Sequence, residues 1–531
     1  MSNIFSFLQS STRLYHDKIY VIDKEKDYTY SEIYNKANVL AGLMYDAGVK
    51  SGDMVLIYLD NSAEYIAAYF GILLLNAIIV PINKNISVES IQYIIEDTSP
   101  LCIITNGVFK LRLQGKVDFA ESSVKSQDFS QSELYSIHFA NIVPTAQSLQ
   151  VLKKGMVINL IDIDRVWETE PDLKPDFTCK LTEDDDRTAL ILYTSGTTRM
   201  PKGVTLTHKN LTANTESIVR YLGLTEEDSL LAVINFGYSY GNSLLLTHTK
   251  MGSKIIIENR VSYPLIVLDQ LYTSKATGFS TVGSYINILL KQEGLKDFHF
   301  KYLRYITFAG ESTSFEDIKK LKCIAGHIKI FVMYGQTEAS ARLSYLEPDL
   351  IFEKAGSIGK GIPGVTLRVV TEDGMETPAG EIGEIIASGD NIMKGYWNNE
   401  EETKSVIKDG WLYTGDLAVT DEDGYIYVKG RKDDIIKYFG HRISPVEIEA
   451  AINSCENVLE SAVIGIEDSN GKQIKAVVVP KNSLACIEEI NAHVRRLLPA
   501  FKRPHLIEFV NELPRTSNGK IKRSELRKVY I

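Results

Sequence analysis

The sequence predicts an α/β protein: a large N-terminal domain with mainly parallel sheets plus a β-rich subdomain, and a small α+β C-terminal domain. Short apolar runs typical of buried strands alternate with helical patterns up to residue 334. Glycines then punctuate residues 361–428, and a new set of helices and strands follows a charged run at 429–434. We therefore expect an N-terminal domain over residues 1–428 and a C-terminal domain over 429–531.

The strands expected in the first domain are runs of aliphatic and β-branched side chains. They cover residues 54–59, 77–82, 101–105, 188–194, 229–234, 254–257 and 328–334. The uncharged stretch 65–82 is long enough to suggest a membrane helix, but its β-branched second half and Pro81 favour a buried helix followed by a buried parallel strand. Residues 106–180, rich in Ser, Gln and Lys, are expected to form variable surface structure.

The C-terminal domain is expected to mix helices and strands. Helices are predicted over residues 445–454 and 487–498, and strands over 461–466, 476–480 and 506–510. From Lys429 onward 18 Lys and Arg stand against 13 Asp and Glu, a net charge of +5, while the rest of the chain carries −15. A basic C-terminal domain could meet a phosphate-rich ligand, and an ordinary solvated surface is the alternative.

Composition places the chain among soluble globular proteins, with 44% hydrophobic and 24% charged residues. Its five cysteines are scattered without zinc or disulfide spacing, which favours a reducing compartment and a cytoplasmic location. The N-terminus lacks the pattern of a secretory signal, and we expect no transmembrane segment. The net charge is −10. The chain is not expected to bind nucleic acid, and the sequence does not fix an oligomeric state.

A glycine- and hydroxyl-rich loop follows the strand expected at 188–194 and reads TSGTTRMPKG. Small residues let backbone N–H groups and side-chain hydroxyls surround phosphate oxygens, and a lysine adds charge. The spacing differs from a Walker A loop, and a plain surface turn is the alternative. The candidate phosphate-binding residues are Thr194, Ser195, Gly196, Thr197, Thr198 and Lys202.

This loop and four later segments resemble, in order, the signatures of the AMP-forming adenylating enzymes, which include acyl- and aryl-CoA synthetases, peptide-synthetase adenylation domains and luciferases. The later segments are YGQTE at 334–338, GWLYTGD at 410–416, GRKDDIIK at 430–437 and NGK at 518–520. The resemblance spans roughly residues 28–526, and five ordered motifs are far more specific than any one of them.

The resemblance implies roles for individual residues. Lys520 and Thr337 would be catalytic, Glu338 would bind Mg²⁺, Asp433 would be the hinge of a mobile C-terminal domain, and Phe439 and Gly440 would line the path of a thiol. An ordinary turn residue is the alternative for Asp416, a solvated residue for Glu338, and a tail lysine for Lys520. The further nucleotide-binding residues that it implies are Gly310, Glu311, Tyr334, Gly335, Gln336, Asp416, Arg431 and Lys437.

The activity implied by the resemblance has two half-reactions. A carboxylate first attacks the α-phosphate of ATP·Mg²⁺ to give an acyl-AMP and pyrophosphate, and a thiol then displaces AMP. The favoured acceptor is coenzyme A, and the alternative is the phosphopantetheine of an acyl or peptidyl carrier protein. A catalytically silent AMP-binding module is a third possibility, against which the intact Lys520, Glu338, Thr337 and Asp416 argue.

The substrate is expected to be a small-molecule carboxylic acid, bound by Tyr238, Tyr240, Phe279 and Val282. No Asp or Glu occurs between Ser229 and Ile257, which disfavours an α-amino acid whose amine needs a carboxylate partner. Arg342, close after the expected Mg²⁺ residue, is unusual. It is interpreted as a surface or structural arginine, with a contact to a polar substrate group as the alternative.

Overall fold

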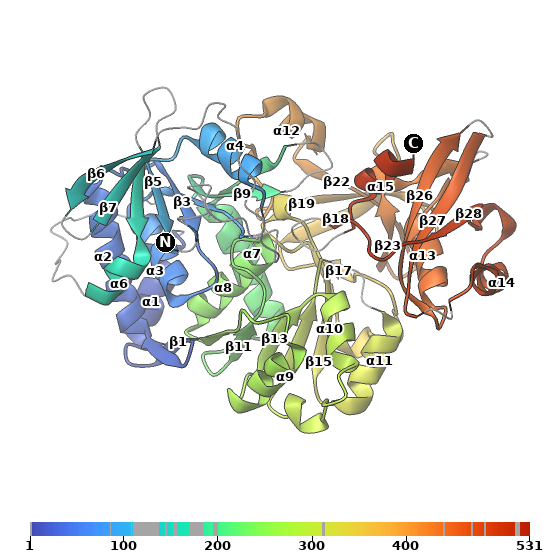
Figure 1. The fold of residues 1–531 in the computed structure, drawn as a ribbon, viewed down its shortest axis with the longest axis horizontal. Coiled ribbons are helices and arrows are strands. Elements are labelled where there is room, and N and C mark those ends of the chain that lie inside the picture. The colour runs from blue at the N-terminus through green and yellow to red at the C-terminus, as the bar shows by residue number, and fades with distance from the viewer. Residues whose placement is uncertain are drawn as a thin grey trace. The chain divides into compact units, whose positions relative to one another are not determined.

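The chain forms two compact units (Figure 1). The first comprises Met1–Thr366 and Ser388–Leu412, and the second comprises Leu367–Ala387 and Tyr413–Ile531. Part of the expected β-rich subdomain thus belongs to the second unit. The domain boundary expected between residues 428 and 429 stays a prediction. The computed structural model describes residues 3–84, 86–107, 109, 137–143, 146–151, 158–169, 184–194, 200–310, 314–438, 441–468, 471–482, 485–515 and 521–530.

Two large, mainly parallel sheets form the first unit. The nine-stranded sheet has the order β17 (Lys360–Gly361), β16 (Ser344–Leu346), β15 (Lys329–Tyr334), β14 (Tyr305–Phe308), β13 (Gly278–Thr281), β11 (Ser229–Ala232), β12 (Lys254–Ile257), β1 (Ile19–Asp23) and β2 (Lys26–Thr29). The seven-stranded sheet has the order β20 (Gly395–Tyr396), β10 (Lys202–Thr207), β9 (Thr188–Thr194), β4 (Ile78–Pro81), β3 (Met54–Tyr58), β5 (Cys102–Thr105) and β8 (Asn159–Asp162).

Helices cover both sheets. Those of the first unit are α1 (Phe5–Leu14), α2 (Tyr30–Asp46), α3 (Ala63–Leu74), α4 (Val88–Thr98), α6 (Ile163–Thr169), α7 (His208–Leu222), α8 (Ser239–Met251), α9 (Pro264–Thr273), α10 (Gly283–Leu290), α11 (Phe315–Ile324) and α12 (Glu400–Val406). Short 3₁₀ turns are η1 (Asp297–Phe300), η2 (Thr337–Ala339) and η3 (Pro348–Leu350), and a separate hairpin joins β6 (Ile137–Val143) to β7 (Ala146–Val151).

The strands of the seven-stranded sheet are buried on both faces. In β3, Val55 and Ile57 pack into the cluster that holds α1, α2, α3 and α8, whereas Leu56 and Tyr58 pack on the opposite side with α4. The first cluster also takes in residues of β11 and β12, so one helical layer serves both sheets. Burial on both faces explains why these strands read as continuous apolar runs rather than as alternating patterns.

The expected strands are confirmed within a few residues, and the structure adds others. The stretch 65–82 is a buried helix, α3, followed by β4, which lies parallel to β3. No helix in the described part of the chain is long and apolar enough to cross a membrane. The interpretation of residues 106–180 as surface structure is wrong for β8, which is fully buried and pairs with β5. The strands β1, β13 and β14 were not expected, because four- and five-residue runs such as GFST carry little pattern.

The second unit contains its own sheets and helices. A five-stranded sheet, most of which lies in this unit, is built from β18 (Val365–Val370), β19 (Gly383–Gly389), β22 (Trp411–Thr420), β21 (Ile407–Lys408) and β23 (Ile426–Arg431). The remaining elements are η4 (Lys432–Asp434), β24 (Ile436–Tyr438), β25 (His441–Ile443), α13 (Pro445–Asn453), β26 (Val458–Asp468), β27 (Gly471–Pro480), α14 (Ile487–Leu497), η5 (Ala500–Lys502), β28 (Leu506–Phe509) and α15 (Arg523–Tyr530). The helices and strands expected after residue 444 are therefore confirmed.

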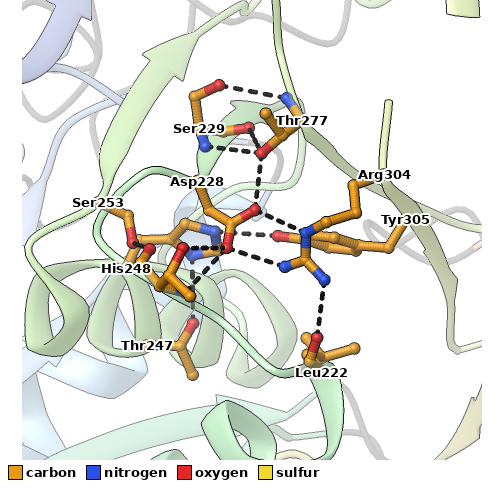
Figure 2. A network of polar contacts seen from close by, with 10 residues as sticks. Leu222, Asp228, Ser229, Thr247, His248, Ser253, Thr277, Arg304 and Tyr305 are labelled. Atoms are coloured by element: carbon orange, nitrogen blue, oxygen red, sulfur yellow. Dashed lines mark hydrogen bonds and ion pairs between the residues drawn. The ribbon is translucent and has the colours of Figure 1, made fainter. Parts of the chain in front are cut away.

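A polar network holds the amino ends of three parallel strands together (Figure 2). Asp228 precedes β11, and its carboxylate accepts two hydrogen bonds from Arg304, which precedes β14, at 2.8 and 3.0 Å. Thr277, which precedes β13, donates to the same carboxylate at 2.9 Å. Burial alone would raise the pKa of Asp228, yet hydrogen bonds from Arg304, Thr225 and Thr277 hold it below its usual value. The network therefore needs the charged carboxylate.

His248 of α8 lies in the same network as a neutral side chain. Its Nδ1 lies 2.9 Å from the Leu244 carbonyl oxygen, and its Nε2 lies 3.1 Å from the Tyr305 hydroxyl. Burial lowers the pKa of His248 to about 4. An unfolded chain binds a proton at this residue below about pH 6.5, and the folded chain does not until about pH 4. Folded-state stability therefore falls as the pH drops through this window.

We expect His248→Gln to reduce this loss of stability. A difference of about 2.5 pKa units corresponds to about 3 kcal/mol between pH 6.5 and 4, so the variant's melting temperature should fall less steeply over this range than that of the native chain. The measurement is thermal unfolding at a series of pH values. The control is His16→Gln, since the His16 side chain is 68% exposed. Parallel pH profiles for native chain and His248→Gln would contradict the assignment.

Candidate adenylate-forming site

Four segments that carry predicted site residues meet at one edge of the nine-stranded sheet. The strands β11, β13, β14 and β15 are mutually parallel, so their carboxyl ends lie together. Beyond these ends come Tyr238, Val282, Gly310 and the segment 334–338. An ideal Cβ on Gly310 would lie 3.8 Å from Val282 Cγ1, so two of these segments touch. Ligands of open α/β sheets bind at such an edge.

The turn after β15 requires glycine at position 335. A Cβ there would lie 1.9 Å from the Ala341 carbonyl oxygen. Ser340 has a left-handed φ of 61°, and its hydroxyl donates to the Asn391 carbonyl at 2.8 Å. Asn391 in turn donates to the Arg342 carbonyl at 2.8 Å. These bonds hold a strained turn that presents Thr337 and Glu338 in η2.

Thr337 and Glu338 each contact a distant segment. The Thr337 hydroxyl lies 3.2 Å from that of Ser239, at the start of α8. The Tyr396 hydroxyl donates to Glu338 Oε1 at 2.8 Å, and the Glu338 carbonyl accepts from the Met393 N–H at 2.8 Å. The orientation of the Glu338 carboxylate is therefore set by Tyr396.

Lys202 lies beside the same tyrosine. Its Nζ is 5.4 Å from the centre of the Tyr396 ring and forms an ion pair with Glu402 of α12. The β20 segment pairs with β10 next to Lys202, which brings Tyr396 to the end of the predicted phosphate loop. Lys202 pairs with Thr194 across the β9–β10 hairpin, and the Thr194 hydroxyl is 3.5 Å from the Lys202 carbonyl. Lys202 and Glu338 thus both contact Tyr396, and Thr194 lies opposite Lys202 on the neighbouring strand.

Asp97 of α4 accepts hydrogen bonds from the β9–β10 hairpin and from Trp397. Its Oδ2 accepts from the Tyr193 hydroxyl at 2.5 Å, and its carbonyl accepts from Trp397 Nε1 at 3.2 Å. Burial, followed by the bond to Asp97, raises the pKa of Tyr193 far above its ordinary value, so this tyrosine stays a hydrogen-bond donor. Asp97 thereby connects the strand before the phosphate loop to the segment that carries Tyr396.

The predicted acid-binding residues do not all lie on the same side of the sheet. Tyr240 donates to the Thr307 carbonyl at 3.0 Å, and its hydroxyl lies 2.8 Å from that of Thr307, which bonds Ser280 of β13. Phe279 is the neighbour of Ser280, so its side chain points to the opposite face, where it is fully buried. The structure brings Tyr238, Tyr240 and Val282 to the carboxyl edge but separates Phe279 from Tyr240, and the predicted role of Phe279 in acid binding stays a prediction.

In the second unit, Asp416 and Arg431 form a cross-strand pair between β22 and β23. The Arg431 Nη1 donates to Asp416 Oδ1 at 3.2 Å and to the Thr414 carbonyl at 2.9 Å. Asp433 is exposed in η4. Its neighbour Asp434 accepts from Arg527 of α15 at 2.8 Å, and this ties the predicted hinge segment to the last helix of the same unit.

Tyr334, Gly335 and Gln336 lie at the end of β15, partly exposed. Lys437 lies in β24, with its side chain outside the described part of the structure. The remaining predicted residues fall outside the described residues: Ser195, Gly196, Thr197, Thr198, Glu311, Phe439, Gly440 and Lys520.

Sequence reasoning did not find Tyr396, Glu402 or Asp97 as parts of the site. Tyr396 lies 58 positions after Glu338, and Asp97 lies 96 positions before Tyr193. Nothing in their local sequence marks them, since a tyrosine after glycine and an acid near a helix end are common. Tyr396 could have been identified only from the pairing of β10 with β20, which places it next to the strand that begins at Lys202.

Comparison with known proteins agrees with this geometry. The family model described as AMP-binding enzyme matches residues 8–397, and the model of the AMP-binding enzyme C-terminal domain matches residues 447–520. The chain is 31% identical to a long-chain-fatty-acid–CoA ligase of Bacillus subtilis (strain 168), over 98% of this chain and 93% of the relative. It is 28% identical to a 2-succinylbenzoate–CoA ligase of Bacillus cereus (strain Q1), over 100% and 99%.

Two solved structures are similar throughout. ATP-bound MatB from Rhodopseudomonas palustris superimposes with a TM-score of 0.86 at 25% identity, covering 100% of this chain and 99% of that one. The o-succinylbenzoate CoA synthetase of Bacillus subtilis, in complex with its acyl-adenylate intermediate, gives a TM-score of 0.82 at 25% identity, covering 98% and 97%. The resemblance inferred from the motifs is confirmed.

We expect Gly335→Ala to destabilise the first unit. The added methyl would overlap backbone atoms that cannot move freely, and we expect a loss of about 2 kcal/mol or more in folding free energy, seen as a lower melting temperature. Gly107→Ala is the control, because the nearest atom to its Cβ lies at an ordinary 3.5 Å. Equal melting temperatures for the two variants would show that the turn tolerates a side chain.

Proposed function

The chain belongs to the AMP-binding enzyme family and is an AMP-forming acid–thiol ligase, and on this premise we propose that it converts a small carboxylic acid to its coenzyme A thioester. The observation that supports the site most directly is the position of Tyr396. Its hydroxyl orients the Glu338 carboxylate, which suits Mg²⁺, and its ring lies beside Lys202, which suits phosphate. One tyrosine therefore contacts both groups. Stand-alone loading of a carrier-protein thiol is the second candidate.

In the first half-reaction, an oxygen of the acid carboxylate bonds to the α-phosphorus of ATP as the bond to pyrophosphate breaks. Lys202 and the loop that starts at Thr194 would bind phosphate oxygens, and Thr337 would donate to the α-phosphate. Asp416 would accept hydrogen bonds from the ribose hydroxyls, with Arg431 beside it. Lys520 would supply positive charge where the carboxylate and the α-phosphate meet. In the second half-reaction, the thiol sulfur bonds to the acyl carbon, AMP leaves, and the thiol proton is released.

Glu338 suits Mg²⁺ because it is a hard oxygen ligand whose orientation is fixed. Within the described part of the chain, no group of three or more His, Cys, Asp or Glu side chains could hold a metal ion. Mg²⁺ that accompanies a nucleotide needs only one or two protein carboxylates beside substrate phosphates. When bound, the ion would neutralise phosphate charge.

The remaining predictions from sequence stay proposals. Asp433 would be the hinge between the two half-reactions, with Phe439 and Gly440 along the path of the thiol and Lys437 near the nucleotide. Tyr238, Tyr240 and Val282 would contact the acid. The cytoplasmic location expected from the cysteine pattern also stays a prediction.

Acid-dependent exchange of pyrophosphate into ATP tests the first half-reaction, and Lys520→Ala tests its main catalytic residue. Loss of a cation that acts in the transition state should lower exchange by roughly 10²–10³ while leaving the melting temperature unchanged. Lys528→Ala, an exposed lysine of α15, is the control. Exchange within a few-fold of native would refute the role of Lys520. AMP release on adding coenzyme A, compared with a phosphopantetheinyl carrier protein, then distinguishes the two acceptors.

Tyr396→Phe tests the link between Tyr396 and Glu338. Loss of the hydroxyl frees the carboxylate, and removal of a group that orients a metal ligand costs roughly tenfold or more in metal affinity. We expect a rise of that size in the Mg²⁺ concentration that gives half-maximal exchange. Tyr272→Phe, on α9, is the control. An unchanged Mg²⁺ dependence would mean that Glu338 does not bind the ion.

A further inference from the structure

Arg342 is an internal residue of the first unit. It follows the η2 turn that presents Thr337 and Glu338, and it is only 2% exposed. Of its interpretation as a surface or structural arginine, the surface part is therefore wrong. Two alternatives remain: a structural role, or contact with a polar group of the substrate.

The described contacts of the Arg342 guanidinium are all with neutral groups. The central carbon lies 4.1 Å from the centre of the Tyr240 ring, Nε lies 3.2 Å from Met333 Sδ, and Nη1 lies 3.5 Å from the Ala341 carbonyl oxygen. Sulfur is a weak acceptor, and 3.5 Å is long for a hydrogen bond. Among the residues that the structure describes, no carboxylate forms an ion pair with Arg342. The Tyr221 hydroxyl is a further hydrogen-bond partner of Arg342. All of these partners are neutral, so none of them balances the charge of the guanidinium.

This arrangement is costly if it is only structural. Arginine stays charged in proteins, and burying an ion is costly even after relaxation. A desolvated cation–π contact offsets only part of that cost. Two other arginines show how this chain pairs guanidinium groups: Arg304 makes two bonds to Asp228, and Arg523 makes two to Glu449. Arg342 differs from both, because no described carboxylate pairs with it, and this leaves the place of an anionic partner open to a ligand.

The surroundings of Arg342 place it at the acid-binding side of the site. Tyr240, on whose ring it stacks, lies in the first turn of α8 directly after Ser239. Ser239 lies 3.2 Å from Thr337, the residue proposed to bind the α-phosphate. The segment 229–257 that forms this side contains no Asp or Glu, so no nearby acidic residue of that segment competes for the guanidinium.

We propose that Arg342 binds a second anionic group of the acid substrate, distinct from the carboxylate that is adenylated. The substrate class is then a dicarboxylic acid, with one carboxylate at the α-phosphate and the other on Arg342. A guanidinium suits this task because its paired N–H groups match the two oxygens of a carboxylate. This inference rests on the proposed function and adds the substrate class to it.

The first test needs only the native enzyme. Acid-dependent pyrophosphate exchange is measured with a panel of aliphatic and aromatic dicarboxylic acids, each paired with its half-amide, and with fatty acids of matched length. The half-amide keeps one reactive carboxylate and removes the second charge. A site that bonds a polar group discriminates strongly against a substrate that lacks it. We expect kcat/KM for the best diacid to exceed that of its half-amide by roughly 10².

Two other outcomes of this panel are distinguishable. If fatty acids or half-amides support exchange and no diacid is preferred to its half-amide, the inference is overturned and the proposed function stands. If no acid in the panel supports exchange, the proposed function fails, and the inference fails with it.

The second test uses Arg342→Met, which keeps much of the side-chain length and removes the charge, and Arg342→Lys, which keeps the charge. We expect the preference for the diacid to fall to within about threefold of unity in the Met variant and to recover in part in the Lys variant, with KM for ATP unchanged. Arg220→Met, an exposed arginine of α7, is the control. A purely structural arginine would instead lower the melting temperature and leave the ratio of diacid to half-amide as in the native enzyme.

Discussion

The shared helical layer between the two large sheets is the constraint on which the rest of the first unit depends. Residues of α1, α2, α3 and α8 pack in one cluster with strands from both sheets. This layer covers one face of each sheet, and the opposite face of the seven-stranded sheet packs against α4. Because the strands β11, β13, β14 and β15 are held parallel, their carboxyl ends form one edge, and the side chains that follow them are gathered there without further help.

At this edge, polar side chains from distant parts of the chain position one another. Tyr396 orients Glu338, Ser239 contacts Thr337, and Asp97 fixes the hairpin that leads into the phosphate loop. The strained turn at Ser340 is tolerated because Asn391 bonds both of its sides. Hydrogen bonds between distant segments hold a site in a single geometry before substrate binds. They thereby limit the reorganisation needed during the reaction.

Three charged pairs of the described residues contrast with Arg342. Asp228 with Arg304, Lys202 with Glu402, and Asp416 with Arg431 are each paired inside their own unit. Lys202 is proposed to bind phosphate and Asp416 to bind ribose. On nucleotide binding, Glu402 would therefore release or share Lys202, and Arg431 would release or share Asp416. Arg342 has a ring and neutral acceptors in place of a carboxylate, and this difference is the basis for assigning it to the substrate.

The sequence by itself determined the α/β class, the main buried strands, the helices and strands after residue 444, and the family, because apolar runs and ordered motifs are local properties of the chain. It also named Thr337, Glu338, Lys202 and Tyr240, which the fold brings to one region. Only the tertiary structure decided that Tyr396 bonds Glu338 and that Arg342 is buried against the Tyr240 ring. It also decided that Phe279 faces away from Tyr240 and that β8 joins the seven-stranded sheet. These facts depend on strand order and on which face a side chain takes, and both are set by the packing of segments far apart in the sequence.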